Sequence, residues 1–109
     1  MFSLVVIDQQ KGIDFPSLGE RNNPDAEKRI TEMLTYWRKQ GMPIFHVKHK
    51  SIDPHSVFWP EQEGFELKRE FLPREDEVLI EKSVPCALTH SRLISELERV
   101  ESNTIVLVG

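Results

Sequence analysis

Four short runs of apolar residues recur along the chain, each bounded by polar or turn-forming positions. They are Leu4–Ile7, Ile44–Val47, Val78–Ile80 and Ile105–Val108. The runs are nearly continuous in valine, isoleucine and leucine. That pattern is typical of strands covered on both faces, as in a parallel sheet. The pattern therefore predicts four buried strands.

A helix is predicted between the first two strands. Asn23 followed by Pro24 is favourable at the N-cap and first helical position. Gly41 and Pro43 are expected to end the helix and prevent its continuation. Its apolar residues recur at the spacing of one helical face and are Ile30, Met33, Leu34 and Trp37.

A second helix is predicted from about Thr89 to Val100. Either Thr89 or Ser91 is suitable as its N-cap, and the sequence does not decide between them. The side expected to face the sheet carries Leu93, Ile94, Leu97 and Val100.

Alternation of buried strands with helices predicts right-handed βαβ units. The expected fold is α/β: one Rossmann-like domain over residues 1–109, with a mostly parallel sheet and flanking helices. The chain given stops at Gly109, directly after the fourth strand. Two helices cannot cover four strands on both faces. We therefore expect much of one sheet face to be bare and the domain to be truncated after the fourth strand.

The stretch from about Lys48 to Asp76 is irregular and rich in proline. A loop this long in a compact domain is usually functional or disordered. Its aromatic content favours an ordered pocket wall or interface, in which we expect exposed side chains at Phe58, Trp59, Phe65 and Phe71.

Composition excludes several function classes. The 109 residues have a formal net charge of -4 and no basic stripe, which argues against nucleic acid as a partner. No apolar run approaches the ~20 residues of a membrane span, and the N-terminus lacks the basic region of a signal peptide. One cysteine, Cys86, excludes a disulfide framework and a cysteine-based zinc site. The expected location is the cytoplasm, with no membrane partner.

Ligands of open α/β sheets bind at the carboxyl ends of the strands. There the sequence places Asp8 and Gln10 after the first strand, His46 and His49 around the second, and Lys82 after the third. A carboxylate and a lysine in one crevice can move a proton and bind an anion. The alternatives are a solvated acid at a strand end, or a structural ion pair between Asp8 and Lys82.

Four stretches together resemble the isochorismatase-like cysteine hydrolases. The first is an apolar strand followed by Asp, any residue and Gln. The others are similar to the family's first helix start, its second strand and the segment carrying its lysine. In order they are residues 4–14, 18–27, 41–49 and 81–88, and the resemblance extends from Phe2 to Gly109.

The resemblance implies a hydrolase that acts on an amide or ureido C–N bond of a small molecule through an Asp–Lys–Cys triad. By position Asp8 would be the acid/base, and Lys82 would stabilise the thiolate. Gln10 would help to orient the acid, and Phe15, Phe58 and Trp59 match regions that line the pocket in relatives, although a small core beneath the long loop explains them equally well. Homo-oligomers are common in the family, and no cofactor is implied.

The family's nucleophile follows the glycine that ends the fourth strand, and this chain ends at that glycine. The chain as given should therefore be inactive. Two hypotheses remain: part of a hydrolase, or an inactive truncated paralogue that serves as a binding or oligomerisation module.

Cys86 is a poor substitute for the nucleophile, because a free cysteine is usually a small buried hydrophobic residue. A metal site is also not expected, although His46, His49, Asp53 and His55 lie within ten residues of sequence. The Asp-x-His pair of nicotinamidases needs a further histidine downstream, and residues 56–77 contain none. His90 is expected to be solvated.

Overall fold

The computed structural model describes residues 2–14, 25–83 and 91–109. The strands pair in parallel and form one sheet in the order β3-β2-β1-β4. Each predicted strand lies within an observed one, which confirms the predicted α/β fold. The strands are β1 (Phe2–Ile7), β2 (Ile44–His49), β3 (Val78–Lys82) and β4 (Thr104–Val108).

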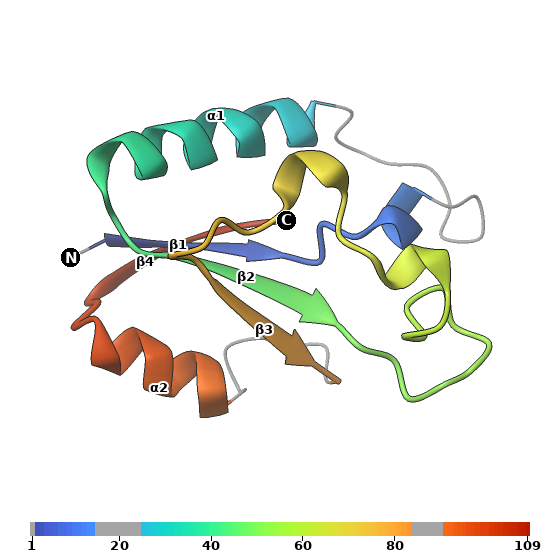
Figure 1. The fold of residues 1–109 in the computed structure, drawn as a ribbon. Coiled ribbons are helices and arrows are strands. Elements are labelled where there is room, and N and C mark those ends of the chain that lie inside the picture. The colour runs from blue at the N-terminus through green and yellow to red at the C-terminus, as the bar shows by residue number, and fades with distance from the viewer. Residues whose placement is uncertain (1, 15–24, 84–90) are drawn as a thin grey trace.

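The two helices, α1 (Ala26–Gln40) and α2 (Ser91–Arg99), lie on opposite faces of the sheet (Figure 1). β2 lies on one side of β1 and β4 lies on the other. The direction of winding therefore reverses between β1 and β4. The carboxyl ends of these two strands form the topological switch point, where doubly wound sheets bind their ligands.

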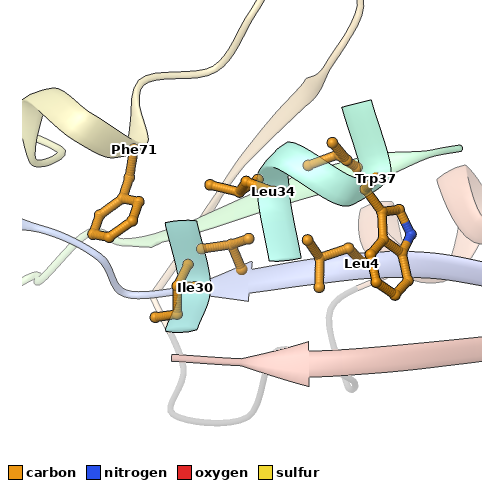
Figure 2. Packing of buried hydrophobic residues seen from close by; sticks show 7 residues of the cluster. Leu4, Ile30, Leu34, Trp37 and Phe71 are labelled. Atoms are coloured by element: carbon orange, nitrogen blue, oxygen red, sulfur yellow. The ribbon is translucent and has the colours of Figure 1, made fainter. Parts of the chain in front are cut away.

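The core between α1 and the sheet combines strand, helix and loop side chains (Figure 2). Leu4 of β1 packs with Ile30, Leu34 and Trp37 of α1, as the helical spacing predicted. Phe71 joins them and is 0% exposed. The expectation of an exposed Phe71 is therefore wrong, because the long loop returns over this face and inserts the ring.

The core on the other face is formed by Val5, Phe45, Val47, Ile80 and Leu93. Leu93 of α2 is fully buried as predicted.

Two predictions about apolar exposure need correction. Ile94, expected to face the sheet, is 43% exposed, because α2 turns this residue away. The expectation that one face would be largely bare is also wrong, since a helix of the described chain packs on each face. Exposure falls instead on the edge strand β4, where Leu107 is 47% exposed.

The helix boundaries differ slightly from the predicted ones. α1 begins at Ala26 with Asp25 at the N-cap, and Asp25 makes no side-chain capping bond. Asn23, the predicted cap, and Pro24 lie outside the described residues. Gly41 ends the helix in the left-handed conformation with φ 67°, as predicted. Ser91 is the first residue of α2 and therefore not its cap, whereas Thr89 is not described.

The long loop is ordered by contacts with the segment that follows β1. The Lys11 N–H donates to the Glu66 carbonyl (2.8 Å) and the Lys68 N–H to the Gln9 carbonyl (2.9 Å). Three short 3-10 helices form here: η1 (Lys11–Asp14), η3 (Glu63–Phe65) and η4 (Arg69–Phe71). The loop thus lies beyond the carboxyl ends of β1 and β2, as Figure 1 shows.

Close backbone packing holds η1 against η3. A Cβ atom at Gly64 would overlap the Val57 carbonyl oxygen, and it would lie 3.0 Å from Cα of Gly12. Gly64 therefore permits an approach that a larger residue would prevent. In the described part of the chain, neither helix has the length and apolar character needed to cross a membrane.

Candidate active site

Asp8 follows β1 directly and has an unusual backbone conformation. Its φ is 57°, in the left-handed region that side chains other than glycine seldom adopt. Its N–H donates to the Val47 carbonyl at 2.8 Å, which ties the turn to β2. Such a conformation costs about 1–2 kcal/mol and is found disproportionately at functional sites.

Lys82 is the last residue of β3, and its side chain is only 1% exposed. The side chain reaches across the end of β2 to Asp8, although β1 and β3 are not neighbours in the sheet. Its Nζ lies 3.1 Å from Asp8 Oδ1 and 3.3 Å from Oδ2, and the contact with Oδ2 is the hydrogen bond. The structure thus brings the predicted pair together as a buried lysine and a partly exposed carboxylate.

The Asp8 carboxylate is unevenly satisfied. Its side chain is 37% exposed, but Oδ1 is buried and accepts no hydrogen bond within the described residues. A hollow of about 370 Å³ adjoins it at the switch point. The residues that line the hollow are Ile7, Asp8, Leu107, Val108 and Gly109. Both carboxylate oxygens therefore face Lys82, and among the described residues the contact of Oδ1 with Lys82 is an ion pair without a hydrogen bond.

Gln10 is fully buried and makes three hydrogen bonds with backbone atoms. Its Nε2 donates to the carbonyls of His49 and Phe65, each at 2.8 Å, and its Oε1 accepts from the His49 N–H at 2.8 Å. The side chain thus joins the end of β2 to the long loop. Its contribution to the site, as described, is to position those backbones; direct orientation of Asp8 stays a prediction.

Of the aromatic residues predicted to line the pocket, Phe58 and Trp59 are described by the structure, and they make different contacts. Phe58 is half-buried and packs edge-to-face on the His49 ring, with centroids 5.7 Å apart, so it borders the site. Trp59 is half-buried, and its indole N–H is directed at Glu61 (3.5 Å). Phe15 lies outside the described residues, as do Cys86 and His90.

The histidines and Asp53 do not converge on a metal position. His46 is buried against Glu77, on the face of the sheet opposite to that of His49. The Asp53 carboxylate accepts a hydrogen bond from the His55 backbone N–H at 2.9 Å. No group of three or more potential metal ligands occurs among residues 2–14, 25–83 and 91–109.

His46 instead belongs to a buried polar network that the sequence did not reveal. Its Nε2 lies 2.7 Å from Glu77 Oε1, and Arg38 donates to both Glu77 oxygens at 2.6 and 2.9 Å. Burial favours the protonated acid, but hydrogen bonds from Arg38, His46 and the Arg74 backbone outweigh it and lower the pKa of Glu77 to about 2. Burial also lowers the pKa of His46. This network links α1 and β2 to Glu77, the residue before β3, and none of its hydrogen bonds among the described residues involves Asp8, which indicates a structural role.

Sequence reasoning placed His49 among the residues at the strand ends but assigned it no role. The structure places it opposite Lys82 in the β2–β3 pairing and against Phe58. The sequence does contain one indication of its orientation. His49 lies two residues after the apolar Val47, and residues two apart on a strand share a face of the sheet.

Comparison with known proteins gives a consistent result. The isochorismatase domain model matches residues 3–109. The isochorismatase family protein YrdC of Bacillus subtilis is 37% identical over 107 residues, which is 98% of this chain and 57% of that protein. The chain thus spans somewhat more than half the length of this relative.

Solved structures give the same picture. An isochorismatase-family protein from Chromobacterium violaceum superposes with a TM-score of 0.88 at 35% identity, covering 96% of this chain and 54% of that one. An isochorismatase from Pseudomonas putida KT2440 has a TM-score of 0.88 at 28% identity, with 97% and 54% covered.

Proposed function

This chain belongs to the isochorismatase family, and on that premise we propose that its site belongs to a cysteine hydrolase that cleaves an amide or ureido C–N bond of a small molecule. The observation that carries the proposal is the buried Lys82 ammonium paired with Asp8 beside the hollow at the switch point. A lysine with a side chain 1% exposed is costly to bury. Its presence at this position supports a chemical role.

The proposed roles follow from the contacts. Asp8 accepts the proton of a cysteine thiol, and its buried Oδ1 accepts no hydrogen bond from the described residues. Lys82 stabilises the thiolate and the negative charge that develops on the substrate. The proposal requires a cysteine next to Asp8, where the hollow meets the end of β4. Of the 109 residues only Cys86 is a cysteine, and we do not assign it this role.

The reaction proceeds in two stages. The thiolate attacks the carbonyl carbon, the C–N bond breaks, and the nitrogen leaves with the proton held by Asp8. Water then gives a proton to Asp8 and attacks the acyl-sulfur intermediate, the acid is released as the carbon–sulfur bond breaks, and the proton on Asp8 returns to the sulfur to regenerate the thiol. In this proposal Phe58 forms one wall of the substrate pocket, and Gln10 holds the backbone of the long loop in place.

The test is ammonia release from a panel of primary amides and ureido compounds by the whole protein expressed from its gene. Lys82→Met should lower kcat/KM by roughly 100-fold or more, because a charge that stabilises the transition state is lost. Lys50→Met, at an exposed lysine outside the pair, is the matched control and should stay within about twofold.

Labelling with iodoacetamide and peptide mapping identifies the nucleophile. A reactive cysteine other than Cys86 whose labelling slows in Lys82→Met supports the triad. Hydrolysis that is indifferent to Lys82 would contradict it. A protein that hydrolyses nothing and has no reactive cysteine would instead be the inactive binding or oligomerisation module.

A further inference from the structure

His49 is the last residue of β2 and lies opposite Lys82 in the β2–β3 register. Two positions earlier, Val47 and Ile80 are also opposite each other, and both belong to the core beneath α2. Because residues two apart on a strand share a face, His49 and Lys82 lie side by side on this same face. The imidazole is therefore a direct neighbour of the side chain that reaches Asp8.

The position of His49 is fixed from two directions. Gln10 binds both its backbone N–H and its carbonyl at 2.8 Å. Phe58 packs against the ring at an interplanar angle of 85°. Edge-to-face contacts of this kind are directional, so they favour one ring orientation.

No described residue makes a hydrogen bond with a ring nitrogen of His49. Within the part of the chain that the structure describes, the hydrogen bonds of His49 involve its backbone atoms alone. Partial burial lowers the pKa of His49, the Lys82 ammonium lowers it further, and the Asp8 carboxylate raises it. The imidazole is thus neutral near pH 7, with one N–H donor and one nitrogen acceptor.

A neutral imidazole suits a neutral polar group. An N–H donor can bind the carbonyl oxygen of an amide or urea, and the ring nitrogen can accept an N–H from it. The neighbouring Phe58 ring supplies an apolar wall for the flat remainder of such a group. A neutral ring also carries no positive charge that would attract a free carboxylate.

We propose that His49 is a substrate-binding residue of this site, which holds the uncharged amide or ureido group of the substrate beside the Asp8–Lys82 pair. This inference rests on the proposed function. It adds a third strand end to the site, so that β1, β2 and β3 each contribute one polar side chain at their carboxyl ends.

Steady-state kinetics with the same amide and ureido panel test the inference. His49→Phe keeps an aromatic ring against Phe58 but removes both polar atoms, and kcat/KM should fall about tenfold or more, mainly through a higher KM. His49→Gln restores a donor and an acceptor and should recover most of the loss. His55→Gln, at an exposed histidine six positions along, is the matched control and should behave as the wild type.

A second measurement checks the geometry without substrate. NMR titration of the His49 imidazole should show a higher pKa in Lys82→Met and a lower one in Asp8→Asn, since these are the charges that act on it. A pKa unchanged by both substitutions would overturn the inference.

The kinetic outcomes separate the two proposals. Turnover that depends on Lys82 but is the same in His49→Phe as in the wild type would refute the role of His49 and leave the hydrolase proposal intact. Turnover independent of Lys82, or no turnover of any compound, would contradict the proposed function and with it the role of His49.

Discussion

Replacing Asp8 by asparagine should destabilise the protein chiefly by leaving Lys82 buried without a counter-charge. Asparagine retains the size of the side chain and tolerates the left-handed backbone that Asp8 adopts, with φ 57°. The substitution therefore changes little except the charge. The Lys82 side chain is 1% exposed, whereas the Asp8 side chain is 37% exposed.

The loss of stability caused by Asp8→Asn lies between two limits. Removing one partner of a fully buried ion pair costs about 3–5 kcal/mol, and an exposed pair contributes less than about 1 kcal/mol. Because one member is buried and the other is partly solvated, we expect Asp8→Asn to lower the free energy of unfolding by about 2 kcal/mol. For a domain of this size the melting temperature should fall by about 8 °C.

A double-mutant cycle isolates the pair. Lys82→Met removes the buried charge while it keeps an unbranched apolar side chain, so adding Asp8→Asn to it should cost less than about 0.5 kcal/mol. Urea unfolding at pH 7, followed by tryptophan fluorescence and far-UV circular dichroism, provides the four free energies. If Asp8→Asn costs the same with and without Lys82, the pair is not coupled and the reasoning is refuted.

Two further predictions concern the scaffold. The pKa of Glu77 is lowered to about 2 in the folded protein, so its stabilising contribution is present above about pH 4.5 and is lost as the pH falls towards 2. Urea unfolding across this range should show a loss of about 3 kcal/mol in the wild type that is missing in Glu77→Gln. Parallel stability curves for the two proteins would contradict the assignment. Phe71→Ala should lower the free energy of unfolding by about 3–4 kcal/mol because the ring is fully buried. Leu72→Ala, at the adjacent residue that is 54% exposed, should change it by about 0.5 kcal/mol or less, and equal costs for both would show that Phe71 does not anchor the loop.

Local patterns in the sequence were sufficient to predict the fold and two residues of the candidate site. Continuous apolar runs predicted the four strands, and helical spacing predicted the face of α1 that packs on the sheet. Asp8 and Lys82 were found because the carboxyl ends of parallel strands meet at one edge. These inferences succeed because periodicity and strand direction are properties of short segments, which tertiary packing seldom reverses.

How deeply each side chain is buried and which residue it contacts could be learned only from the tertiary structure. An isolated lysine at a strand end is usually solvated, and only the order β3-β2-β1-β4 shows that the buried Lys82 side chain crosses β2 to a partly exposed carboxylate. Phe71 in a proline-rich loop gives no periodic pattern, yet the fold of the loop inserts it into the core. The position of His49 beside Lys82 depends on the register of two strands separated by 28 residues, from residue 50 to residue 77.

By itself, the sequence determined the elements of this protein, the sheet's parallel character and the residues at its strand ends. The tertiary structure decided which of those residues lie together, how deeply each is buried and what charge each one faces. The physical reason is that hydrophobic periodicity is encoded within a few residues, whereas desolvation and Coulomb energy depend on groups brought close by strand order and register.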